Sequence, residues 1–205
     1  MNASPQVLRR FIILMALLTF GMFTFWMVYG SYLESPEGDY EVREGDILLG
    51  DRKYNEAIER FDVALEKSPN HRGAMMGKAI ALLQSERFEE AEAEFTRLIA
   101  FLSENVAPDD QTGIAVLAGA YANRGILRDR AGRYEDALAD YAQSLKIDEE
   151  AVAGPDVIQK ILYGRPRPAT VRKRAAYLIK QFQLPESERL MRVPELDADQ
   201  RMHKP

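Results

Sequence analysis

Residues 54–61 read YNEAIERF, and similar octapeptides return at residues 88–95 (FEEAEAEF) and at residues 134–141 (YEDALADY). Each octapeptide has an aromatic residue first, an alanine fourth and an aromatic residue last. The first interval is 34 residues, the length of one helix–turn–helix unit in a solenoid. The second interval is 46 residues, which indicates a regular array with a 12-residue insertion. The sequence therefore predicts an all-α solenoid of three helix pairs.

Small residues recur on the first helix of each predicted pair, at Gly45, Ala79 and Gly125. A small side chain at this place lets two helix axes approach to about 8 Å, the lower end of the usual range. The alanine and the last aromatic residue of each octapeptide are four positions apart, so they share one face of the second helix. The aromatic ring then fills the space between neighbouring units. We expect these residues to form the core of the array.

This pattern resembles the tetratricopeptide repeat (TPR) family, whose members commonly bind other proteins. In the first unit, Gly45, Ala57, Phe61 and Pro69 stand at the family's glycine, alanine, phenylalanine and proline spacings. The second unit has Ala79 in place of the glycine, and neither the second nor the third unit has the closing proline. The resemblance implies a scaffold rather than a catalyst. It covers residues 38–148, with units at about 38–71, 72–105 and 110–148.

An apolar segment precedes the repeats, and residues 11–33 contain no charged side chain. Its uninterrupted part, residues 11–29, would span about 28 Å as a helix, close to the hydrocarbon thickness of a bilayer. Trp26, Tyr29 and Tyr32 lie at its end, where aromatic rings favour the membrane interface. A cleaved signal peptide is the alternative, but its apolar region would be shorter. We therefore predict an uncleaved transmembrane helix over residues 11–33.

The charges beside this segment predict its orientation. Arg9 and Arg10 precede it, and Glu34 and Glu37 follow it. Because positive charge accumulates on the cytoplasmic side, residues 1–10 are expected in the cytoplasm and the repeats outside it. The expected location is the bacterial inner membrane, crossed once, with the TPR array in the periplasm.

The charge changes sign along the rest of the chain. Residues 34–164 carry 15 lysine and arginine residues against 27 aspartate and glutamate residues, whereas residues 165–205 carry 10 against 5. An acidic array repels phosphates, which argues against nucleic-acid binding. We expect capping helices over residues 155–183 and an extended basic tail over residues 184–205. Two hypotheses remain for the tail: it packs on its own acidic array, or it contacts a partner or lipid headgroups.

The resemblance also implies a binding surface, because TPR arrays commonly bind peptides in the concave groove lined by the first helix of each pair. Some TPR domains clamp a C-terminal carboxylate there with lysine and asparagine. Here Val42 and Asp46 occupy the first two of those positions, so the clamp is absent. The apolar groove is covered either by the chain's own insertion or basic C-terminal helix, or by an apolar or basic helix of a partner. The implied groove residues are Val42, Asp46, Leu49, Met76, Ile80, Leu83, Ala122, Ile126 and Asp129.

Catalysis has little support in the sequence. There is no cysteine, and neither His71 nor His203 has the spacing of a metal ligand. We expect no enzyme activity, no metal, no cofactor and no small-molecule substrate. The predicted function is a membrane-tethered TPR scaffold, an accessory or assembly subunit of a membrane protein complex that binds a partner protein through the solenoid and the transmembrane helix. The alternatives are a client-presenting factor similar to the membrane-anchored TPR proteins of cytochrome c biogenesis, and a regulator of a cell-envelope enzyme.

Overall fold

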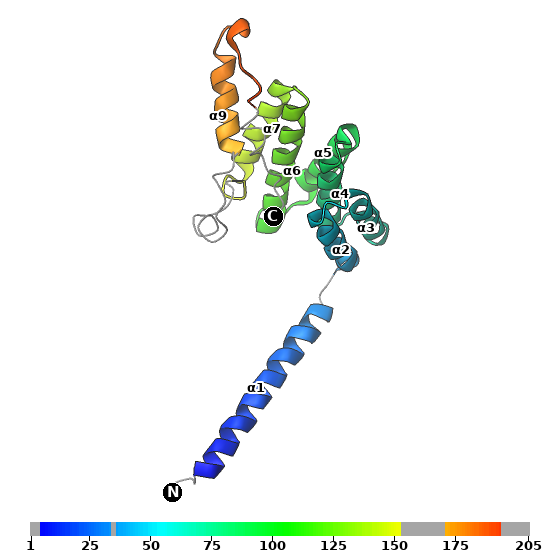
Figure 1. Ribbon diagram of the computed structural model, residues 1–205, viewed down its shortest axis with the longest axis vertical. Coiled ribbons are helices and arrows are strands. Elements are labelled where there is room, and N and C mark those ends of the chain that lie inside the picture. Colours follow the sequence, from blue (N-terminus) through cyan, green and yellow to red (C-terminus); the bar gives the residue numbers. More distant parts are fainter. Residues whose placement is uncertain (1–4, 34–35, 153–170, 194–205) are drawn as a thin grey trace.

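The computed structural model describes residues 5–33, 36–152 and 171–193, and every regular element within these ranges is helical (Figure 1). Within these residues the all-α prediction is confirmed. The short capping helix expected from Pro155 lies outside the described residues, and so does the tail from residue 194.

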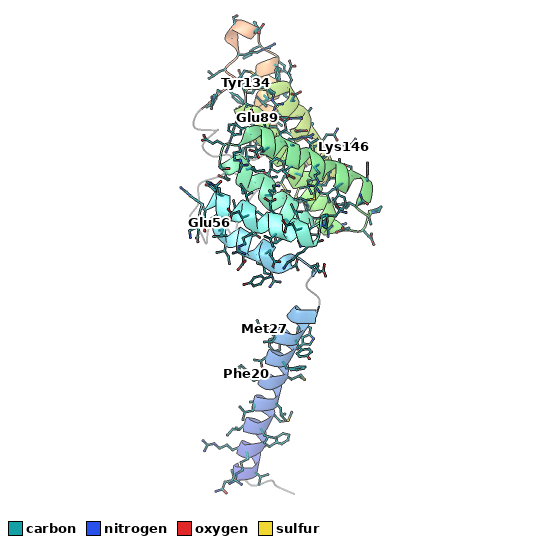
Figure 2. All side chains as sticks on the ribbon, turned by 90° about the vertical axis from the view of Figure 1, so that its right-hand side faces the viewer. Phe20, Met27, Glu56, Glu89, Tyr134 and Lys146 are labelled. Atoms are coloured by element: carbon teal, nitrogen blue, oxygen red, sulfur yellow. The ribbon has the colours of Figure 1, made fainter. Side chains whose placement is uncertain are left out.

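The N-terminal helix α1 (Pro5–Leu33) stands apart from the array, and its side chains, including Phe20 and Met27, radiate from it (Figures 1 and 2). Its stretch Pro5–Gly30 is long and apolar enough to cross a membrane, and none of it is buried. The hydroxyl groups of Thr19 and Thr24 donate to carbonyl oxygens one turn earlier, at 2.8 and 2.9 Å. These side-chain donors are therefore satisfied within the helix, as an apolar surrounding requires.

Arg9, Arg10, Trp26 and Tyr29 are all exposed on α1, and the side chain of Tyr32 is outside the described part. The ring of Phe25 stacks on that of Tyr29 with centroids 4.8 Å apart. The array leaves the whole apolar surface of α1 uncovered.

Three antiparallel helix pairs follow, and within this array each helix after the first packs on the one before it. The first helices of successive pairs also touch, α2 against α4 and α4 against α6, so the pairs stack in one direction. This is the solenoid that the 34-residue period predicts. The pairs are α2 (Asp39–Gly50) with α3 (Tyr54–Lys67), α4 (Arg72–Gln84) with α5 (Phe88–Asn105), and α6 (Gln111–Arg130) with α7 (Tyr134–Ile147).

The turn inside each pair has the same backbone geometry. Arg52, Glu86 and Gly132 all adopt a left-handed conformation, with φ values of 62°, 62° and 76°. These residues are 34 and 46 positions apart, the same intervals as the octapeptides. Each donates its amide to the carbonyl three residues back, which satisfies an oxygen at the end of the first helix. The structure therefore confirms the register of the three units, and only Gly132 is free of the strain of a left-handed side chain.

The motif residues explain how closely the helices approach. A Cβ atom added at Gly45 would lie 2.6 Å from the ring of Phe61, and one added at Gly77 would also meet that ring. In the third unit a Cβ at Gly125 would lie 2.7 Å from the ring of Tyr141. Phe61 and Tyr141 are fully buried. Each ring thus occupies the space that the missing side chain leaves free.

The 12-residue insertion lengthens two helices. Helix α5 has 18 residues against 14 in α3, and α6 has 20 against 13 in α4. The sequence predicts the end of α5 at Asn105 and a cap at Asp109 or Asp110, and Asp110 is the cap, accepting from the Gly113 amide at 2.8 Å. The second pair begins at His71, which caps its first helix: its Nδ1 accepts from the Ala74 amide at 3.3 Å.

The basic helix α9 (Val171–Phe182) closes the array by packing against α7, and the short 3-10 turn η1 (Glu186–Glu188) follows it. Figure 1 places α9 and α2 at opposite ends of the stack. Consequently one end of the described solenoid is covered by a helix of the chain itself.

Candidate partner-binding surface

The nine predicted groove residues do not form one open groove. Asp46 and Leu49 are partly exposed. The others are covered by the rest of the chain, so the first helices present a continuous surface only at the beginning of the array. Those that are at most 9% exposed are Val42, Met76, Ile80, Leu83, Ala122, Ile126 and Asp129.

An open pocket of about 440 Å³ brings three of the nine together: Asp46 and Leu49 from α2, and Ile80 from α4. It spans the first two units and combines apolar side chains with an acidic and a basic group. A site of this size and mixture suits a side chain or short segment of a protein partner. The remaining lining residues are Gly50, Arg52, Tyr54 and Gln84.

In the third unit Asp129 is held by buried partners. Its Oδ1 accepts from Nη2 of Arg174 and its Oδ2 from Nε of the same guanidinium, both at 2.6 Å. The Tyr141 hydroxyl donates to Oδ2 at 3.0 Å. The Arg174 and Asp129 side chains are 1% and 2% exposed. A carboxylate enclosed in this way is a structural anchor for α9 and is not displayed to a partner.

Apolar contacts complete this closure. Ala122 and Ile126 belong to the same buried cluster as Val171, Ala175 and Leu178 of α9. The basic C-terminal helix therefore packs on its own array at the third unit. At that end of the groove the cover comes from the chain itself, which is one of the two alternatives that the sequence left open. Between the second and third units, the first helices cover each other, because the side-chain amide nitrogen of Asn123 on α6 lies 3.6 Å from the sulfur of Met76 on α4.

Charge pairs across each helix pair were missed by the sequence reasoning. Glu44 and Arg60 approach to 3.4 Å in the first unit, and Arg124 and Asp140 to 2.8 Å in the third. The Lys78 ammonium lies 2.9 Å from Glu94 in the second unit. Each pair is 16 residues apart, so opposite charges repeating at this spacing were a readable signal.

In the second and third units, the cation of the pair also contacts the preceding unit. Lys78 lies 2.8 Å from Asp62 of α3, and Arg124 donates to the Thr96 hydroxyl of α5 at 3.0 Å. Burial favours a lower pKa for Lys78, but its hydrogen bonds to Asp62 and Glu94 raise that pKa above its usual value. Lys78 and Arg124 are therefore cations that join neighbouring units.

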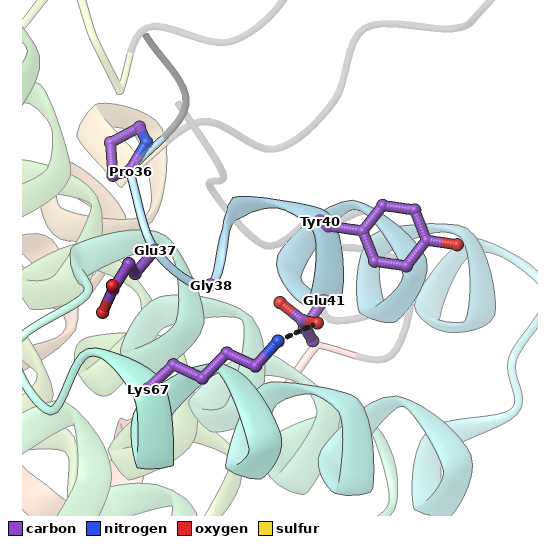
Figure 3. Close-up of a pocket in the computed structure, with 6 residues that line it drawn as sticks. All are labelled: Pro36, Glu37, Gly38, Tyr40, Glu41 and Lys67. Carbon is purple, nitrogen blue, oxygen red and sulfur yellow. Dashed lines mark hydrogen bonds and ion pairs between the residues drawn. The ribbon is translucent and has the colours of Figure 1, made fainter. Parts of the chain in front are cut away.

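A second open pocket, of about 590 Å³, lies where α2 begins and α3 ends (Figure 3). Within it Lys67 donates to Glu41 at 2.6 Å, and this hydrogen bond lowers the pKa of the Glu41 carboxyl. Nearby, His71 contacts Asp39 through Nε2 at 2.8 Å and caps α4 through Nδ1. These groups satisfy one another. In the described ranges no three histidine, cysteine or acidic residues are grouped to hold a metal ion.

Helix pairs stacked in this way define a helical-repeat protein. Residues 42–106 match the family model of the tetratricopeptide repeat, so this part of the chain is similar to that family. Among solved structures, the Arabidopsis OM64 TPR domain matches with 20% identity and a TM-score of 0.47, covering 67% of this chain and 95% of that chain. No curated protein matches this chain.

Proposed function

We propose that this protein is a membrane-tethered TPR scaffold, an accessory or assembly subunit that binds a partner protein within a membrane complex. The observation that carries the proposal is the unburied apolar stretch Pro5–Gly30 placed directly before a repeat array. A TPR fold supports interaction with a protein, and a membrane anchor would confine that interaction to a bilayer surface.

The anchor is proposed to stay uncleaved, with the N-terminus in the cytoplasm and the array in the periplasm of a bacterial cell. Arg9 and Arg10 before the apolar segment and acidic residues after it support this orientation. A reporter active only in the periplasm, fused to the C-terminus, is expected to be active. Activity of a cytoplasmic reporter instead, or release of the array as a soluble protein, would overturn the topology.

The partner is proposed to use the pocket formed by Asp46, Leu49 and Ile80. Leu49 is the informative position, because it lines the pocket and is only partly buried where it packs against the core, so Leu49→Asp adds a charge to the pocket. Ile80 is 3% exposed, so Ile80→Asp would bury an unpaired charge and unfold the unit.

Affinity purification from detergent extracts of the full-length protein tests the scaffold role. Stoichiometric recovery of one multisubunit complex supports a permanent subunit, and transient capture of unfolded chains supports a client-presenting factor. We expect Leu49→Asp to reduce recovery without changing the helical circular dichroism of the array. Recovery of no polypeptide by the wild-type protein would contradict the scaffold proposal.

A further inference from the structure

The outer face of α2 carries two large apolar side chains that the described chain leaves uncovered. Tyr40 is 68% exposed and Ile47 is 66% exposed. They are seven residues apart, which is two helical turns, so they lie on one face. Figure 3 shows the Tyr40 side chain on α2, directed away from Glu41 and Lys67.

The repeat itself shows what normally covers this face. The residues equivalent to Tyr40 are Ala74 and Ala120, and those equivalent to Ile47 are Ala81 and Leu127. All four equivalents are fully buried, because α4 packs against α3 and α6 packs against α5. In the first unit the place of the preceding helix is not filled by any described segment. The exposed face therefore has the shape of a helix-docking site.

The charge between these two side chains is reversed in the first unit. Glu44 stands where the second and third units have Lys78 and Arg124, the cations that reach the preceding helix. Within the described residues, Glu44 forms an ion pair with Arg60 of its own unit, at 3.4 Å, and a hydrogen bond with Tyr40 of the same helix, and neither contact reaches a preceding helix. A helix in the preceding place would therefore complement Glu44 with a basic residue.

We propose that the Tyr40–Glu44–Ile47 face of α2 is the docking site for a basic amphipathic helix of a partner protein, which completes the solenoid at its membrane-proximal end. The chain already contains the chemistry of such a contact, since the basic helix α9 packs on the acidic array through Arg174 and Asp129. This inference rests on the proposed scaffold function and identifies the chemistry of its partner.

Charge argues against two other occupants. Helix α2 has four acidic residues and one arginine, so a second copy related by two-fold symmetry would bring two negative helices together. Anionic lipid headgroups would be repelled for the same reason. The five residues between α1 and α2 span at most about 20 Å, so a partner helix at this face would lie near the membrane surface.

The test is photo-cross-linking of the full-length protein in its native membranes, with p-benzoylphenylalanine in place of Ile47. We expect one polypeptide adduct, mapped by mass spectrometry to a helical segment with lysine or arginine. Adding Glu44→Lys should lower its yield at least about tenfold, because like charges then face each other. Changing the partner's basic residue to glutamate should restore the yield in the Glu44→Lys background.

Two control positions make the outcomes distinct. The same cross-linker at Glu89, exposed on α5, should give no such adduct (Figure 2). The same cross-linker at Leu49 reports on the pocket between the first two units. Adducts to lipid or to a second copy at Ile47, or a yield that is unchanged by Glu44→Lys, would overturn this docking site. If Leu49 captures a protein and Ile47 does not, the docking site fails while the scaffold function stands; no protein adduct at either position contradicts both.

Paired substitutions check that the face is not needed for folding. Ile47→Asp changes an exposed residue, so the helical circular dichroism should be unchanged while the complex is lost from detergent extracts. Ile179→Asp is the matched control, because Ile179 is also an exposed isoleucine, 48% accessible, on the helix at the other end of the stack. Loss of the complex in both variants, or in neither, would contradict the proposal.

Discussion

The buried pair of Asp129 and Arg174 joins the C-terminal helix α9 to α6. The two side chains are 1–2% exposed and share two hydrogen bonds of 2.6 Å, and Tyr141 adds a third to the carboxylate. Asp129→Asn keeps the shape but leaves the guanidinium of Arg174 charged and uncompensated. Removing one partner of a buried pair costs about 3–5 kcal/mol.

Urea denaturation of the full-length protein in detergent, followed by circular dichroism at 222 nm, measures this cost. For an m value of about 2 kcal/mol per M, the midpoint should fall by about 1.5–2.5 M. The double variant Asp129→Leu with Arg174→Met removes both charges, and the Tyr141 hydroxyl and the Met191 carbonyl each lose one hydrogen bond. Its loss should be about 1–3 kcal/mol, smaller than that of Asp129→Asn.

The exposed pair of Arg87 and Glu90 is the control. Its hydrogen bonds of 2.6 and 2.7 Å are as short as those of the buried pair, but its side chains are 42% and 58% exposed. Because solvent and salt screen such a pair, Glu90→Gln should leave the midpoint unchanged. The reasoning is refuted if Asp129→Asn moves the midpoint no more than Glu90→Gln does, or if the double variant is less stable than Asp129→Asn.

Three further predictions use the same urea assay. Glu86→Gly should stabilise the array by about 1 kcal/mol, because glycine adopts the left-handed backbone conformation without strain. Gly132→Ala should destabilise it by a similar amount for the same reason. Midpoints that move in the same direction in both variants would contradict this. Gly77→Ala should cost about 1–3 kcal/mol because its Cβ meets Phe61, and adding Phe61→Leu should recover part of that loss; without recovery the clash is not the cause. Hydrogen bonds from Arg133 and Arg128 lower the pKa of Glu92 below 4.5. The stabilisation that the ionised Glu92 gives the folded state is therefore present above pH 4.5, and it is lost as the pH falls through the lower pKa that Glu92 has in that state. Glu92→Gln should therefore destabilise the protein at pH 6 and weaken the pH dependence of the free energy of unfolding below pH 4.5. An equal loss of stability at every pH would refute this.

The fold was largely predictable because each repeat is a local unit with a strong pattern. The octapeptide that ends in Phe61 has similar counterparts after 34 and after a further 46 residues, and the glycine and alanine positions follow from the approach of two helices. The cap at Asp110 was also readable, since aspartate favours the start of a helix. His71 was not readable as a cap, because its role depends on the Asp39 carboxylate that the fold brings to its other ring nitrogen.

The candidate surface was less predictable, since exposure depends on which helix follows and which precedes. Family positions place Asp129 and Ile126 in a groove, but α9 covers both. Tyr40 and Ile47 were not singled out, because the equivalent positions in the other units are core residues. Their exposure results from the position of α2 at the end of the stack.

The sequence by itself determined the helical period, the register of three units, the insertion and the apolar segment, because each shows in the types and spacings of residues along the chain. Only the tertiary structure decided which surfaces are closed and which are available. The burial of Asp129 requires Arg174, 45 residues away, and the exposure of Ile47 depends on what lies beside α2. Solvent accessibility is a property of the assembled stack, so no local pattern encodes it.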